Sequence, residues 1–126
     1  MSTTPELIMD EFKPNPEAEF FIASWRTLAQ SAHDNAKAKG FWDNIRSIPA
    51  WLAEVHGELS EILGAAKLGN PESKKIPGFT QIEEECADVV LRMMDTGEGL
   101  GFRIAEALVA KMAYNETRER LHGKEF

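Results

Sequence analysis

Four acidic side chains form two pairs that share a three-residue spacing. Glu58 and Glu61 make the first pair, and Glu85 and Asp88 make the second. Side chains three residues apart lie about 5–6 Å from each other on one face of an α-helix, so each pair aims two carboxylates in the same direction. Carboxylate oxygens are ligands for Mg²⁺, which completes its coordination with substrate phosphates. Two such pairs that face each other therefore predict a Mg²⁺ site.

Two further acidic residues lie on the same expected helices, Glu54 one turn before the first pair and Asp95 two turns after the second. On a helical wheel these acidic positions border the apolar stripe of their helix, where a side chain can face a cleft while its neighbours are buried. Acidic residues at this spacing are also common on solvent-exposed helix faces, and either pair alone is weak evidence. The roles of Glu54 and Asp95 stay open.

Local start signals predict the helices that carry these residues. Asn15 followed by Pro16 is typical of an N-cap and a first helical position. A second helix is expected to begin near residues 47–49, and Thr80 with Glu83 matches a capping box. The expected helices span residues 16–39, 48–67, 81–96 and 103–121.

The remaining sequence predicts turns and no sheet. Gly97, Gly99 and Gly101 predict a turn between the last two helices. No segment shows the alternation of polar and apolar residues that is typical of a strand. The sequence therefore predicts an all-α fold, a four-helix bundle-like domain at residues 17–126 preceded by an irregular N-terminal arm at residues 1–16.

Charge and composition exclude some classes of partner. The chain has 14 basic and 21 acidic residues and a formal net charge of −7. An acidic protein gains nothing from counterion release on DNA or RNA, so a nucleic acid polymer is not an expected partner. A small anion can still bind if a metal ion supplies positive charge. Cys86 is the one cysteine, so no intrachain disulfide can form. Without a leader pattern or a membrane-spanning apolar run, we expect a cytoplasmic protein with no membrane partner.

The residues around both acidic pairs resemble the motifs of MazG-like nucleoside triphosphate pyrophosphohydrolases, an all-α family. The segment HGELSE at residues 56–61 is similar to the first-helix motif of a short, single-domain branch, and EECADVVLR at residues 84–92 is similar to its second motif. The segment KMAYNETR at residues 111–118, followed by HGK, is similar to the family's C-terminal Lys-x-x-x-Asn-x-x-Arg segment. The resemblance covers about residues 50–126 in the family's order. One departure is Gly57, where the family often has a glutamate.

The resemblance implies an activity and a set of site residues. The implied reaction is hydrolysis between the α- and β-phosphates of a nucleoside triphosphate, which yields a nucleoside monophosphate and pyrophosphate and serves to clean the pool of (d)NTPs. The implied catalytic residues are Glu58 and Glu61, either of which can take a proton from the attacking water. The implied ligands for Mg²⁺, with Mn²⁺ as an alternative ion, are Glu58, Glu61, Glu85 and Asp88. The implied substrate-binding residues are Lys111, Asn115, Arg118 and Lys124.

Some alternatives stay open from the sequence. Trp25, Trp42 and Trp51 each either stack on the base of the nucleotide or pack in the core. A non-catalytic helical interaction or regulatory module with the same fold is the main rival to an enzyme. A ferritin-like di-iron protein is disfavoured because that architecture uses Glu-x-x-His steps, which the two acidic pairs lack. We also expect a homodimer or homotetramer, since four helices alone would leave part of their apolar surface exposed.

Overall fold

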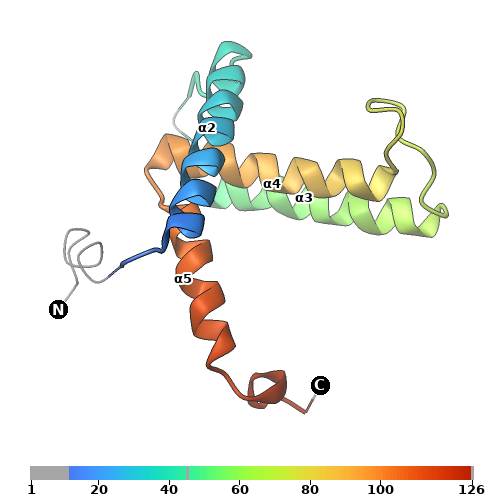
Figure 1. Ribbon diagram of the computed structural model, residues 1–126. Helices are drawn as coiled ribbons and strands as arrows, with labels where there is room; N and C mark the ends of the chain where they lie inside the picture. Colours follow the sequence, from blue (N-terminus) through green and yellow to red (C-terminus); the bar gives the residue numbers. More distant parts are fainter. Residues whose placement is uncertain (1–11, 45, 126) are drawn as a thin grey trace. The chain divides into compact units, whose positions relative to one another are not determined.

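The structure, a computed structural model, describes residues 12–44 and 46–125 (Figure 1). Within these residues it contains helices and no strand, with one isolated antiparallel bridge between Glu72 and Thr80. The predicted all-α fold class is thereby confirmed, whereas most of the predicted arm at residues 1–16 lies outside the described residues. None of the described helices is both long and apolar enough to cross a membrane. The elements are α2 (Pro16–Ala38), α3 (Ile48–Lys67), α4 (Gln81–Leu100), α5 (Ile104–Glu116) and the 3₁₀ helix η1 (Arg120–Gly123).

The chain divides into two compact units. The terminal unit comprises Met1–Thr27 and Arg103–Phe126, and the central unit comprises Leu28–Phe102. In the described part of the terminal unit, Arg26 on α2 forms an ion pair with Glu106 on α5. The central unit contains residues 28–38 of α2, about half of that helix, and all of α3 and α4. It therefore carries both acidic pairs.

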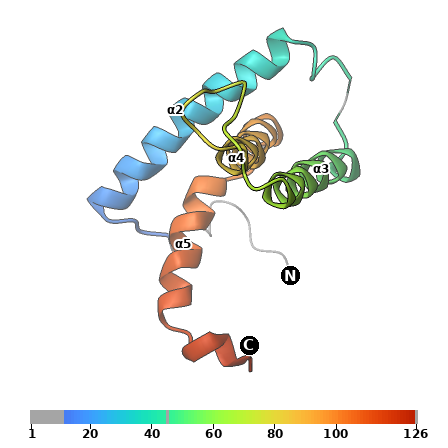
Figure 2. The same cartoon turned by 90° about the vertical axis from the view of Figure 1, so that its right-hand side faces the viewer.

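Helices α3 and α4 pack side by side along their lengths, and Figure 2 shows both nearly end-on. Local caps determine where each helix begins. The Ser47 side chain accepts a hydrogen bond from the backbone N–H of Ala50 at 3.2 Å, which fixes the start of α3. At the start of α4 the Thr80 side chain accepts from the N–H of Glu83 at 3.2 Å, and the Glu83 carboxylate accepts from the N–H of Thr80 at 2.9 Å. These two predicted starts are confirmed.

The start of α2 also agrees with the sequence prediction, because the Asn15 side chain accepts a hydrogen bond from the N–H of Ala18 at 2.8 Å. Pro16 is the first residue of the helix, as expected. Its fixed φ suits a first helical position, where the missing N–H would have no partner in the helix.

The predicted end of α4 was wrong. The glycine-rich segment does not form a turn after Thr96; instead α4 continues to Leu100, and Gly101 ends it in the left-handed conformation with φ of 75°. A tertiary contact explains the continuation. A Cβ atom on Gly99 would lie 2.4 Å from the Trp42 ring, so the glycine lets that ring pack directly on the helix backbone. This packing outweighs the low helix propensity of glycine, which costs about 1 kcal/mol relative to alanine.

The predicted end of α5 was also wrong, since α5 ends at Glu116 rather than near Leu121. The Thr117 hydroxyl donates a hydrogen bond to the carbonyl of Tyr114 at 2.7 Å, and the N–H of Arg118 bonds to the carbonyl of Asn115. These bonds to carbonyls three residues back tighten the last turn and stop the α-helix. Arg118 therefore lies beyond the helix on which the sequence placed it.

Candidate metal and phosphate site

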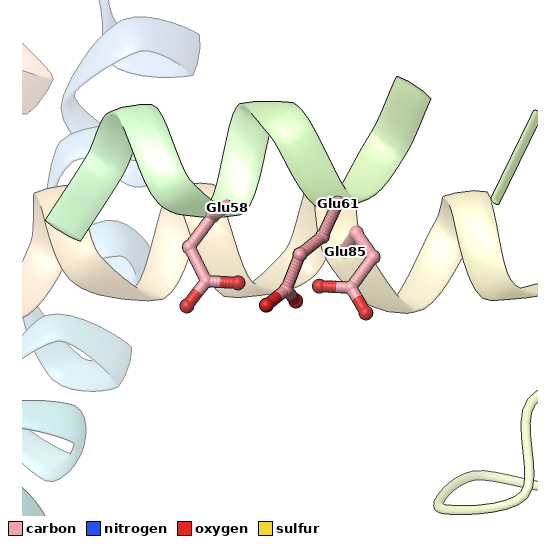
Figure 3. Close-up of side chains that lie close together, drawn as sticks. All are labelled: Glu58, Glu61 and Glu85. Carbon is pink, nitrogen blue, oxygen red and sulfur yellow. The ribbon is translucent and has the colours of Figure 1, made fainter. Parts of the chain in front are cut away.

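Carboxylates from α3 and α4 meet along the line where the two helices pack. Single carboxylate oxygens of Glu58, Glu61 and Glu85 all lie within 4.8 Å of one another. Figure 3 shows these three side chains projecting to the same side of the helix pair, with Glu61 and Glu85 facing each other. A second group of three, Glu84, Glu85 and Asp88, meets the same distance criterion. The structure thus brings the four predicted carboxylates into two groups joined by Glu85.

Glu84 was missed from the sequence. It neighbours Glu85, and consecutive residues on a helix point about 100° apart, so a search for residues three apart on one face did not include it. The structure includes it because the loop before α4 folds back onto it: the hydroxyl of Ser73 donates a hydrogen bond to the Glu84 carboxylate. A contact with a loop residue is not visible in the helical periodicity.

Burial and mutual repulsion disfavour full ionisation of the cluster. Burial, together with the hydrogen bond and negative charge of Glu61, raises the pKa of Glu85 from 4.5 to about 8. Burial, followed by the charges of Glu58 and Glu84, likewise raises the pKa of Asp88. The second carboxylate oxygen of Glu85, Oε2, is buried and has no hydrogen-bond partner within the described residues. A buried, unpartnered carboxylate oxygen among other carboxylates fits a hard divalent cation, which needs several oxygen ligands.

Arg92 forms hydrogen bonds with glutamates at one edge of the carboxylate cluster. Its Nε and Nη2 donate hydrogen bonds to Oε1 of Glu58 at 2.9 and 2.7 Å, and its Nη1 donates to Oε2 of Glu54 at 3.0 Å. Burial lowers the pKa of the Arg92 guanidinium, but the hydrogen bond and the negative charge of Glu58 outweigh burial, so the pKa of Arg92 is raised. Glu54 belongs to neither carboxylate group. Its structural role is therefore to pair with arginine side chains, including Arg46 at 3.5 Å.

Asp95 lies at the centre of a separate polar cluster. Its Oδ1 accepts a hydrogen bond from Trp42 Nε1 at 2.8 Å and lies 2.9 Å from His33 Nδ1. The His33 and Trp42 rings meet edge to face at 4.9 Å, and the Arg46 guanidinium lies 5.0 Å from the centre of the Trp42 ring. Asp95 is only 7% exposed and is in neither carboxylate group. It joins α4 to the end of α2 and to the segment after it.

An open cleft of about 520 Å³ in the central unit borders both clusters. That volume lies within the usual range for small-molecule sites, about 300–1,000 Å³. The side walls include apolar residues of α2, such as Leu28 and Ala32. The charged lining residues are Glu58, Asp88, Asp95, Arg46, Lys75 and Arg92. A metal ion on the carboxylates would therefore lie beside a cleft that contains both acidic and basic groups.

All four predicted substrate-binding residues belong to the terminal unit. Lys111 Nζ lies 4.8 Å and the Arg118 guanidinium 5.7 Å from the centre of the Tyr114 ring. The Asn115 side-chain oxygen is buried without a hydrogen-bond partner in the described residues. Lys124 follows η1 and is exposed. Binding of substrate by Lys111, Asn115, Arg118 and Lys124 stays a prediction.

The tryptophans have different surroundings. Trp42 packs on Gly99 and His33 next to the polar cluster of Asp95. Trp51 lies 6.5 Å from Phe102, centre to centre, and Trp25 lies 6.0 Å from Phe21 in the terminal unit. Trp42 is thus the tryptophan whose ring contacts Arg46, a lining residue of the cleft.

Comparisons with protein-family models, with curated proteins and with solved structures gave no match. The fold and the site themselves define an all-α protein in which two packed helices carry a carboxylate cluster beside an open cleft. The resemblance to the MazG-like family therefore rests on the sequence motifs alone and stays a prediction.

Proposed function

We propose that the protein is a Mg²⁺-dependent nucleoside triphosphate pyrophosphohydrolase of the MazG-like type, which acts on (d)NTPs and releases a nucleoside monophosphate and pyrophosphate. The observation that carries the proposal is the convergence of Glu58, Glu61, Glu85 and Asp88 from two helices beside the cleft. A solvent-exposed acidic face would leave its carboxylates apart and ionised, whereas here burial raises the pKa of Glu85 to about 8. A divalent cation removes the cost of bringing these charges together.

Glu58, Glu61, Glu85 and Asp88 would hold Mg²⁺, with Mn²⁺ as an alternative that also prefers oxygen ligands. When bound, the metal neutralises charge on the phosphates and lowers the pKa of a coordinated water. The side chains of the cleft would orient the nucleotide so that its α-phosphate faces this water.

Glu61 is better suited than Glu58 to take the proton of the attacking water. Glu58 is only 12% exposed at its side chain, and its Oε1 already accepts two hydrogen bonds from Arg92, so this oxygen is less accessible to a water molecule. Glu61 is exposed, and within the described residues it shares a hydrogen bond with Glu85 and forms no ion pair with a cation. We therefore assign the role of general base, which the sequence left open between the two glutamates, to Glu61.

The proposal includes a homodimer or homotetramer. Leu52, Leu59 and Leu63 are 43%, 47% and 57% exposed and recur along one stripe of α3 at spacings of seven and four residues. An apolar stripe of this kind on a helix is suited to packing against a second copy. Size-exclusion chromatography with light scattering tests it, and a monomeric mass in dilute solution contradicts it.

Pyrophosphate release decides between the enzyme and its main rival, a non-catalytic interaction module. Purified protein is incubated with each common NTP and dNTP, with Mg²⁺ or with a chelator, and pyrophosphate and orthophosphate are measured separately. We expect metal-dependent pyrophosphate from at least one nucleotide, and its loss in Glu61→Gln and Asp88→Asn. Glu98→Gln is the matched control, because Glu98 lies on α4 outside both carboxylate groups. An absence of turnover with every nucleotide would support the non-catalytic module.

A further inference from the structure

The cleft contains three cationic side chains, and two of them are already paired with carboxylates. Arg92 hydrogen-bonds to Glu54 and Glu58. Arg46 lies 3.5 Å from Glu54 and 3.6 Å from Asp95, and its side chain is 6% exposed. Lys75 also lines the cleft, but it makes no hydrogen bond or ion pair through its ammonium group within the described residues. Among these three, Lys75 is the cation that can bind an incoming anion without breaking an existing pair.

The loop that carries Lys75 is fixed by its own hydrogen bonds. Ser73 is 2% exposed, and its hydroxyl oxygen accepts hydrogen bonds from the N–H groups of Lys75 and Ile76 at 3.2 and 3.1 Å. The same hydroxyl donates to Glu84 on α4, within the second carboxylate group. The backbone of Lys75 is therefore tied to the helix that carries the acidic residues, which lowers the entropy cost of holding its side chain over the cleft.

The charge of Lys75 also acts on a carboxylate that borders the cleft. The positive charge of Lys75 opposes the burial and repulsion that raise the pKa of Asp88, so the ammonium group is close enough to act on that carboxylate. Lys74, the preceding residue, is exposed and is not among the residues that line the cleft. The two lysines have the same charge and lie on the same loop, but of the two only Lys75 is a lining residue of the cleft.

We propose that Lys75 binds a phosphate group of the nucleotide in the cleft, a role that the sequence motifs did not assign to it. The inference rests on the proposed function, because it needs a polyphosphate that bridges the carboxylate cluster and the loop. Phosphate oxygens bind an ammonium group strongly through charge-assisted hydrogen bonds. Lys75 would thus add a contact on the α4 side of the cleft, from the loop between α3 and α4.

The test compares Lys75→Gln with Lys74→Gln, a control that removes the same charge from the same loop. Calorimetric titration of inorganic pyrophosphate in the presence of Mg²⁺ measures phosphate binding, and steady-state kinetics with the best nucleotide measures KM and kcat. For Lys75→Gln we expect the Kd of pyrophosphate and the KM to rise at least about ten-fold, as for the loss of a hydrogen bond to a charged group. Lys74→Gln should change both less than about two-fold, because Lys74 does not line the cleft.

Titration of Mg²⁺ alone separates phosphate binding from a structural role. Loss of a positive charge that faces Asp88 should leave Mg²⁺ affinity unchanged or increase it, whereas a disturbed loop would weaken Mg²⁺ and pyrophosphate binding together. Equal effects of Lys75→Gln and Lys74→Gln on pyrophosphate would overturn the role of Lys75 while leaving the proposed function intact. Wild-type protein that binds no pyrophosphate and hydrolyses no nucleotide would overturn the proposed function and this inference with it.

Discussion

Binding of Mg²⁺ should depend steeply on pH because a proton occupies the site when the metal is absent. The pKa of Glu85 is raised from 4.5 to about 8 by burial and by Glu61, so the carboxyl group is mostly protonated at neutral pH. Mg²⁺ needs the ionised form and must displace this proton. Below pH 8 the apparent affinity should therefore fall about ten-fold per unit, a loss of about 50-fold between pH 8 and pH 6 for one proton.

Isothermal titration calorimetry in two buffers of different ionisation enthalpy measures this exchange directly. At pH 7 a group with a pKa of about 8 should release about 0.9 proton for each Mg²⁺ bound. Glu85→Gln should bind Mg²⁺ more weakly and release much less, since the titrating ligand is gone. An affinity that stays constant from pH 6 to pH 8, with no proton released, would refute the explanation that Glu85 is a protonated ligand.

Three further predictions follow from the fold. Between pH 4.5 and about 8, the metal-free folded protein keeps the Glu85 proton, whereas the unfolded chain has lost it. The melting temperature should therefore fall as the pH rises through this window. A melting temperature that rises instead would contradict the raised pKa of Glu85. In urea denaturation, Gly99→Ala should destabilise the protein by about 1–3 kcal/mol, because the new Cβ would lie 2.4 Å from Trp42. Gly64→Ala is the control and should stabilise the protein by about 0.5–1 kcal/mol, because a Cβ there has no neighbour within 4 Å. Equal effects of the two substitutions would rule out the clash with Trp42. Leu63→Glu should lower the mass found by light scattering, and an unchanged oligomer places the interface elsewhere.

The helix starts could be predicted from the sequence because their signals are local. Asn15, Ser47 and Thr80 each cap a backbone N–H three residues later, so a short window contains the whole interaction. The end of α4 could not be predicted in this way. Gly99 stays helical because it contacts Trp42, which is distant in the chain, and no local pattern contains that contact.

In the candidate site, too, the features set by local helical spacing could be predicted, whereas those set by distant contacts could not. Helical spacing was sufficient to group the carboxylates of each helix, and the packing of α3 on α4 then brings Glu61 and Glu85 together. The positions of Lys75 and Arg46 relative to the cleft depend on two connecting segments, whose paths no periodic pattern encodes. Asp95, whose role the sequence left open, binds Trp42 Nε1 instead of joining the carboxylate groups.

Under the proposed function, carboxylates of two neighbouring helices bind a shared divalent ion. A crystal grown with Mn²⁺ and a nucleotide whose α–β bridge resists hydrolysis, with anomalous data collected for manganese, tests it most directly. We predict an anomalous peak in contact with oxygens of this carboxylate set, Glu58, Glu61, Glu85 and Asp88, and with the phosphates of the nucleotide. Full nucleotide occupancy with no manganese among these carboxylates would contradict the account.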